Sequence, residues 1–155
     1  MADARLNVTS IVKKLHGAFC RDEPRQALLQ LAADLIHDTG APYTSAYLYM
    51  LNESGDMLEL EAFAGRETEH TRIPVGSGLC GKAVREQRDL NVPNVGADAD
   101  YLACNIYTKS ELIVLIRRHD EILGQIDIDS DIPNGFDENE EAALRDVADG
   151  LAALL

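Results

Sequence analysis

Residues 111–129 read ELIVLIRRHDEILGQIDID, and this stretch predicts the centre of the fold. Apolar residues on both faces of Glu111–Arg118 are typical of a strand in the middle of a sheet. The polar residues His119–Glu121 predict a three-residue turn, and Ile122–Asp129 alternates as a returning strand does. We therefore expect an antiparallel hairpin at the centre of the sheet.

Amphipathic helices are predicted on both sides of this hairpin. Apolar residues recur at helical spacing over about residues 4–20. A second helix is expected from a cap at Asp22, through Pro24 in its first turn, to a stop at Gly40. A last helix is expected to begin at Asp137. The apolar stripes at both ends of the chain predict a homodimer through the terminal helices.

The chain between the first helices and the central hairpin predicts a second hairpin and a polar middle segment. Ser45–Leu51 alternates, and turn residues separate it from Met57–Phe63. A short helix is expected over Gly78–Gln87, and residues 96–110 form a polar loop of a length that is usually functional. We infer one α+β domain over residues 1–155, with an antiparallel sheet, the N- and C-terminal helices on one face and the middle segment on the other.

The composition excludes several classes of function. Asp and Glu number 27 against 14 Lys and Arg, and the net charge of −13 repels phosphate backbones and anionic lipid headgroups. The longest apolar runs are far shorter than a membrane span, and residues 1–10 carry no signal-peptide core. We therefore expect a cytoplasmic protein that binds neither nucleic acid nor membrane.

The chain has three cysteines, Cys20, Cys80 and Cys104. Their odd, low number argues against a disulfide framework, and no CxxC or HExxH pattern indicates a zinc site. Cys80 lies in the first turn of its expected helix, where unpaired amides favour a thiolate; a small buried hydrophobe is the alternative. For Cys104, in the polar loop, a redox role and simple packing both stay open, and Cys20 is expected to be structural.

Acidic side chains converge if the central hairpin has the right register. Asp127 and Asp129 share one face of their strand with Gln125, and Glu111 joins them when it lies opposite Asp129. The three-residue turn would give that register, whereas a bulge at Gly124 would shift it. Converging carboxylates indicate a pocket for a cation, either an amino group or a metal ion; the alternative is a solvated sheet face.

Residues 76–81, GSGLCG, match the GxGxxG pattern but do not open a βαβ unit, so we exclude a dinucleotide site. The glycines instead allow a tight turn that presents backbone amides to a ligand carboxylate at the helix start, near Gly78 and Leu79. Amides for a carboxylate and aspartates for an ammonium group together indicate an amino-acid ligand.

The order of these elements resembles a GAF domain, a relative of the PAS fold, and three short blocks resemble the free methionine-(R)-sulfoxide reductases. The blocks are Ile73–Gly81, Leu102–Cys104 followed by Ser110–Glu111, and Ile126–Ser130. The resemblance covers about residues 72–151 well and the first half at the level of the fold. It implies a GAF-like domain that reduces the R epimer of free methionine sulfoxide.

This resemblance also implies a role for each site residue. Cys104 would attack the sulfoxide sulfur and become a sulfenic acid, and Cys80 would resolve that acid as a disulfide, which thioredoxin reduces. Glu111, Asp127 and Asp129 would hold the substrate ammonium and polarise the sulfoxide, and we assign Asp129 as the proton donor. Neither a cofactor nor a metal ion is implied.

Four positions depart from the family pattern, and at one of them Leu115 stands where a proline is expected. His70 stands where a further cysteine is usual, and Thr44 and Leu48 align with a Trp and a Tyr that line the methyl pocket. These departures favour a second function, a non-catalytic GAF module that binds a small amine or amino acid as a sensor. A structural dimerisation unit is a third function, but it leaves the acid cluster unexplained.

Overall fold

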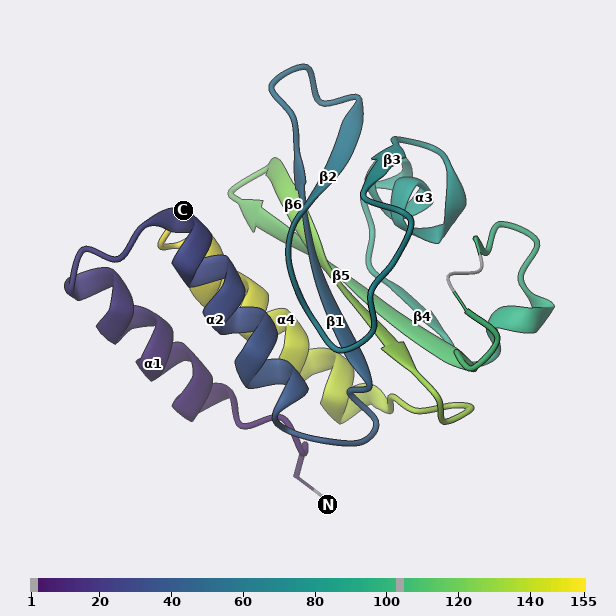
Figure 1. Cartoon of the computed structure of the whole chain (residues 1–155), viewed down its shortest axis with the longest axis horizontal. Coiled ribbons are helices and arrows are strands. Elements are labelled where there is room, and N and C mark those ends of the chain that lie inside the picture. Colours follow the sequence, from purple (N-terminus) through teal and green to yellow (C-terminus); the bar gives the residue numbers. More distant parts are fainter. Residues whose placement is uncertain (1–2, 103–104) are drawn as a thin grey trace.

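The computed structural model describes residues 3–102 and 105–155, and over these ranges the chain forms a six-stranded sheet flanked by α-helices (Figure 1). Neighbouring strands are antiparallel, in the order β3-β2-β1-β6-β5-β4. The elements are α1 (Val8–Cys20), α2 (Arg25–His37), β1 (Ser45–Leu51), β2 (Met57–Ala64), β3 (Arg72–Pro74), α3 (Gly78–Glu86), β4 (Leu90–Val92), a 3₁₀ turn (Val95–Ala97), β5 (Ser110–Arg118), β6 (Glu121–Ser130) and α4 (Glu138–Ala152).

The two faces of the sheet carry different cores. α2 packs on β1 and β2, α4 packs on β5, and α1 packs against both of these helices, so the terminal helices share one side (Figure 1). α3 lies on the opposite face. Side chains alternate between the faces: Leu48, Leu112 and Ile128 pack toward the terminal helices, whereas Tyr49 and Ile113 pack toward α3. The predicted α+β architecture is therefore confirmed.

Two helices begin later than the sequence predicts. α1 starts at Val8, where the side chain of Asn7 accepts a hydrogen bond from a first-turn amide at 3.0 Å. α2 starts at Arg25, and the predicted cap, Asp22, instead adopts a left-handed φ of 60° in the turn between the helices. An N-cap residue usually has extended backbone angles itself, and the left-handed φ of Asp22 does not meet this requirement.

The central hairpin has the predicted register but not the predicted turn. Glu111 lies opposite Asp129, as expected. The turn has two residues rather than three, with His119 at a left-handed φ of 55°, and a bulge next to Gly124 restores the register. A Cβ on Gly124 would overlap the backbone of Tyr49 on β1, so glycine allows the bulge to lie against its neighbour.

A buried carboxylate attaches the N-terminal segment to α4. Asp137 caps this helix as predicted, accepting a hydrogen bond from the Glu140 amide at 2.9 Å. The Glu140 carboxylate is itself buried and accepts from the amides of Arg5 at 2.7 Å and Leu6 at 3.3 Å, and from the Tyr43 hydroxyl at 2.7 Å. One side chain therefore joins three parts of the fold.

Glu140→Ala should lower the free energy of unfolding by about 3 kcal/mol, because three donors lose a charged acceptor at once. Glu138→Ala, at an exposed position in the same helical turn, should change it by less than about 0.5 kcal/mol. Urea unfolding of the two variants measures the difference. Equal stability of the two variants would show that this attachment contributes nothing.

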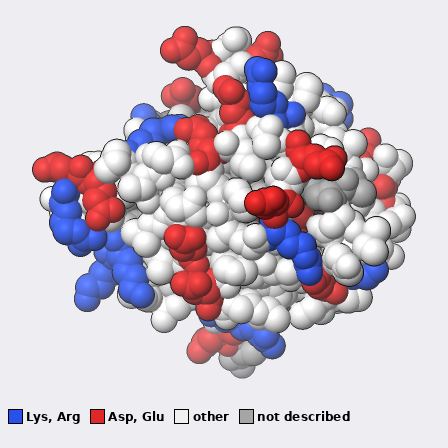
Figure 2. All heavy atoms as spheres, in the orientation of Figure 1, with Lys and Arg blue, Asp and Glu red and all other residues white. Residues whose placement is uncertain are grey.

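On one face of the molecule, acidic side chains do not gather into a single patch (Figure 2). On the face shown in Figure 2, acidic side chains are scattered, and basic side chains gather over α1 at the left. No helix in the described ranges is long and apolar enough to cross a bilayer. The acidic groups that converge lie inside the molecule.

Candidate functional site

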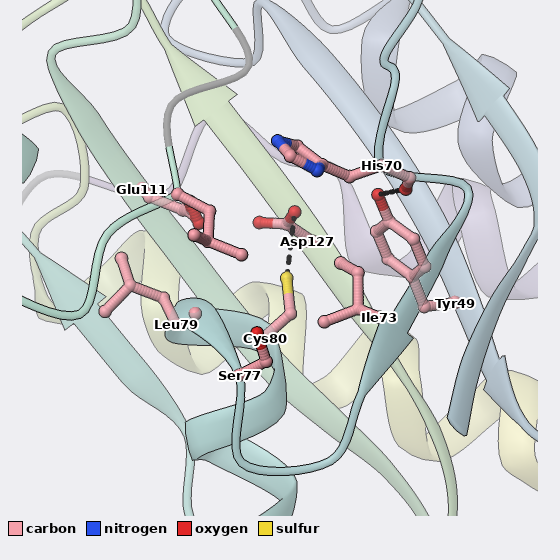
Figure 3. Close-up of a pocket in the computed structure, with 10 residues that line it drawn as sticks. Tyr49, His70, Ile73, Ser77, Leu79, Cys80, Glu111 and Asp127 are labelled. Carbon is pink, nitrogen blue, oxygen red and sulfur yellow. Dashed lines mark hydrogen bonds between the residues drawn. The ribbon is translucent and has the colours of Figure 1, made fainter. Parts of the chain in front are cut away.

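A pocket opens between the start of α3 and the sheet, on the face opposite the terminal helices (Figure 3). The space between its walls is about 320 Å³, a volume that includes open solvent at its mouth. The described residues that line it are Tyr49, His70, Ile73, Ser77, Gly78, Leu79, Cys80, Leu102, Glu111 and Asp127.

The predicted carboxylates converge at this pocket. Glu111 lies opposite Asp129 across the β5–β6 pair, and Asp127 lies two positions from Asp129 on the same face. The exposed fractions are 5% for Glu111, 5% for Asp127 and 3% for Asp129. Glu111 and Asp127 line the cavity, whereas Asp129 is not among the described lining residues and hydrogen-bonds with Glu111.

Burial raises the pKa of two carboxyl groups of this cluster, Asp127 and Asp129. It raises the pKa of Asp127 from 3.8 to about 6, although hydrogen bonds with Cys80 and Glu111 act in the opposite direction. The pKa of Asp129 is raised well above 3.8, first by burial and then by the charge of Asp127. None of the described lining residues is a lysine or an arginine. The pocket is therefore an acidic cavity that a cationic ligand would stabilise.

Cys80 lies in the first turn of α3, but its thiol is not activated there. The residue is 7% exposed, and its Sγ donates a hydrogen bond to Asp127 Oδ2 at 3.3 Å. Burial, followed by the charges of Asp127 and Glu111, raises the pKa of Cys80 well above its ordinary value. Of the two interpretations that the sequence leaves open for Cys80, these contacts favour the buried thiol over the thiolate, because burial and the nearby carboxylates outweigh the partial charge of a helix terminus.

The loop before β5 approaches the pocket beside α3. Leu102 lines the pocket and packs on Gly78, and Lys82 Nζ pairs with Asp100 Oδ2 at 2.9 Å. Cys104, the predicted attacking cysteine, lies outside the described residues, two positions after Leu102 in the sequence. The described part of this loop therefore reaches the cavity through Leu102.

Arg66 holds the later part of the same loop. Its guanidinium pairs with both carboxylate oxygens of Asp131, at 2.6 and 2.5 Å, and lies 4.9 Å from the centre of the Tyr107 ring. The Arg66 charge lowers the pKa of Asp131, in contrast to the raised pKa of Asp127 and Asp129. Asp131 is therefore a paired acid, outside the acidic cavity.

Neither Thr44 nor Leu48, the positions that align with the two pocket aromatics of the family, is among the described residues that line the pocket. Leu48 packs in the core under the terminal helices, and Thr44 precedes β1, where its hydroxyl accepts a hydrogen bond from the Asp131 amide at 3.1 Å. Tyr49 lines the pocket, and Tyr47 packs in the core on the same side as α3. Adjacent strand residues point to opposite faces, so Leu48 and Tyr49 lie on opposite sides of the sheet.

Sequence reasoning did not identify several lining residues. The alternation of β1 was the available signal for Tyr49, whose hydroxyl donates to the His70 carbonyl oxygen at 2.7 Å. The His70 imidazole points into the cavity (Figure 3). Ile73 belongs to β3, and an edge strand of three residues is too short for periodicity to reveal.

Comparison with known proteins identifies the family. The model of the GAF domain matches residues 23–155, so the chain belongs to the GAF domain family.

The chain is also similar to individual proteins, two of which are free methionine-R-sulfoxide reductases. The chain is 32% identical over 146 residues to protein YtsP of Bacillus subtilis, covering 94% of this chain and 88% of that protein. It is 30% identical over 129 residues to the free methionine-R-sulfoxide reductase of Escherichia coli, and the match covers 83% of this chain and 76% of that protein. The structure of the type II free methionine-R-sulfoxide reductase of Thermoplasma acidophilum matches with a TM-score of 0.79 at 36% identity, covering 84% and 91%. The resemblance to a GAF domain and to these reductases is confirmed.

Proposed function

We propose that this protein reduces free methionine-(R)-sulfoxide to methionine with a pair of thiols and without a cofactor. The observation that carries the proposal is the buried cluster of Glu111, Asp127 and Asp129 beside the Cys80 thiol. The similarity to free methionine-R-sulfoxide reductases supports the same substrate. We place the protein in the reducing cytoplasm, where free thiols persist and a thioredoxin-class reductant is available.

The pocket offers a partner for each charged group of this substrate. The ammonium group is bound by Glu111 and Asp127, which line the cavity. The carboxylate is bound by the first-turn amides of α3 at Gly78 and Leu79, positions that a helix leaves without intrahelical partners. The ring of Tyr49 contacts the apolar part of the side chain.

The reaction proceeds in two thiol steps. The Cys104 thiolate attacks the sulfoxide sulfur, the oxygen passes to the Cys104 sulfur as a sulfenic acid, and methionine leaves, reduced by two electrons. The Cys80 thiol then condenses with the sulfenic acid, which releases water and forms a disulfide. A thioredoxin-class dithiol reduces this disulfide and restores both thiols.

Asp129 supplies the proton for the sulfoxide oxygen. Burial raises the pKa of Asp129 and so favours the protonated carboxyl group, and its hydrogen bond with Glu111 connects it to the cavity. After burial, the charge of Asp127 is the next cause that raises the pKa of the Cys80 thiol. The bound ammonium group offsets this charge and so lowers that pKa again. The substrate thus provides the positive charge on which the thiol chemistry depends.

A methionine-release assay with each sulfoxide epimer and a thioredoxin system tests the proposal. We expect turnover of the R epimer and none of the S epimer. N-acetylated methionine sulfoxide lacks the ammonium group. Its reaction rate should be lower by about a hundredfold or more, because two buried carboxylates lose their cationic partner. Release of methionine from neither epimer by the reduced protein would contradict the proposal.

A non-catalytic GAF module that binds an amino acid as a sensor is the second candidate. The observation that favours it is the Cys80 thiol, which is buried and held protonated by its neighbours. Such a module would bind methionine sulfoxide in a calorimetric titration without releasing methionine. Binding together with release decides for the reductase.

Gly78→Ala should weaken the binding of methionine sulfoxide about tenfold. Gly78 has a φ of 64°, and a Cβ there would lie 2.9 Å from Leu102 Cγ, so the pocket wall must move. Gly76→Ala is the matched control, because Gly76 has a φ of 94° but its nearest neighbour would lie 3.6 Å away. The free energy of unfolding of both variants should fall by about 1–2 kcal/mol, because alanine at a positive φ is strained. Calorimetric titration should show weaker binding in Gly78→Ala alone. Equal affinities of the two variants would contradict the view that the contact between Gly78 and Leu102 shapes the binding pocket.

The homodimer through the terminal helices stays a prediction. Phe19, near the end of α1, is 45% exposed and offers an apolar side chain on this side of the molecule. Light scattering at micromolar concentration should give the mass of a dimer, and the mass of a monomer would contradict it.

A further inference from the structure

We propose that Cys80, Glu111 and Asp127 form a binding site for a thiophilic divalent metal ion such as Zn²⁺. The Cys80 Sγ and one carboxylate oxygen from each of Glu111 and Asp127 lie within 4.8 Å of one another. They come from α3, β5 and β6, and Figure 3 shows all three side chains converging in the pocket. All three are buried, so the fold holds the donors together at the cavity.

A second observation points to a ligand at the same place. Asp127 is 5% exposed, and its Oδ1 is buried without a hydrogen-bond partner among the described residues, while Oδ2 accepts from Cys80. Buried acceptors without donors are costly, and a cation satisfies them.

The donor set selects the kind of ion. A sulfur ligand favours Zn²⁺ and similar soft or borderline ions over Mg²⁺ and Ca²⁺, which prefer oxygen alone. Three protein ligands would leave a fourth tetrahedral position free for a further ligand, and all three donor residues line the cavity. The thiol proton, which now bridges Cys80 and Asp127, is displaced when the metal binds.

This inference does not depend on the proposed reductase activity. The metal and an amino-acid ammonium group would occupy the same carboxylates, Glu111 and Asp127, so only one can bind at a time. In a reductase, a bound zinc ion would therefore compete with the substrate and inhibit the reaction. In a sensor, the zinc ion could itself be the ligand.

The test uses a protein in which Cys80 is the only thiol. Cys20→Ser/Cys104→Ser removes the other two cysteines, including Cys20, whose exposed Sγ lies 3.6 Å from His16 Nδ1 and could bind metal at the surface. Titration with Cd²⁺ should produce a thiolate-to-cadmium charge-transfer band that saturates at one equivalent. Adding Cys80→Ser to this protein should remove the band.

Zinc affinity is then measured by competition with a chromophoric chelator, in the same double-variant background and without any amino acid. Asp127→Asn should lower the affinity about tenfold or more. Asp131→Asn removes a half-exposed carboxylate that pairs with Arg66, and should leave the affinity unchanged. Circular dichroism verifies that each variant is folded.

Two results would overturn the proposal. One is the absence of a charge-transfer band from the protein that retains Cys80 alone. The other is a folded Asp127→Asn variant that binds Zn²⁺ as tightly as its parent. Because Cys104 is absent and no substrate is added, neither result bears on the reductase proposal, and failure of methionine release does not bear on the metal site.

Discussion

Cys104→Ser should abolish methionine release, a fall of about 10³-fold or more, because serine cannot form the thiolate that attacks the sulfoxide sulfur. Cys20→Ser is the matched control. Cys20 is exposed at the end of α1, on the side of the sheet opposite the pocket, and this variant should keep the wild-type rate. Steady-state release of methionine from the R epimer measures both.

Cys80→Ser should cause a different defect from Cys104→Ser. One equivalent of methionine should be released and the reaction should then stop, because the sulfenic acid on Cys104 has no thiol with which to condense. Dimedone should label Cys104, and mass spectrometry locates the adduct. Full turnover by the Cys104→Ser variant would exclude Cys104 as the nucleophile. Continued turnover by the Cys80→Ser variant would exclude Cys80 as the resolving thiol.

Asp127→Asn should stabilise the protein at neutral pH while it removes amino-acid binding. The pKa of Asp127 is about 6 in the folded chain against an ordinary 3.8, so the folded state binds more protons between these values. The stability that this group contributes is therefore present below about pH 4 and is lost as the pH rises through about 6. The whole difference corresponds to about 3 kcal/mol. We expect the asparagine variant to gain about 1–3 kcal/mol at pH 7.5 and nothing at pH 3.5.

Asp131→Asn is the control for this prediction, because Asp131 has the opposite shift. Its pKa is lowered by Arg66, so the stability that the pair contributes is present above the ordinary value of 3.8 and is lost as the pH falls. The variant should be unchanged or less stable at pH 7.5. Urea unfolding at both pH values measures the two variants. A loss of stability at pH 7.5 in Asp127→Asn would contradict the destabilising burial of this carboxylate.

Strand periodicity allowed much of the candidate site to be predicted. Apolar residues on both faces of Glu111–Arg118 located a central strand, and the alternation of β6 placed Asp127 and Asp129 on one face. The opposition of Glu111 to Asp129 was predicted with the wrong turn, because the two-residue turn and the bulge next to Gly124 together give the same register. The bulge depends on the approach of β1, which lies far away in the sequence.

The sequence by itself determined the order of the elements, the two-faced sheet and the shared face of Asp127 and Asp129, since these follow from local periodicity. Only the tertiary structure decided that Tyr49 and not Leu48 borders the pocket, because this depends on the pairing of β1 with β6. Only the tertiary structure decided that the Cys80 thiol is protonated. Its pKa is raised by burial and by Asp127, which lies 47 positions away along the chain, and charges act through space rather than along the sequence.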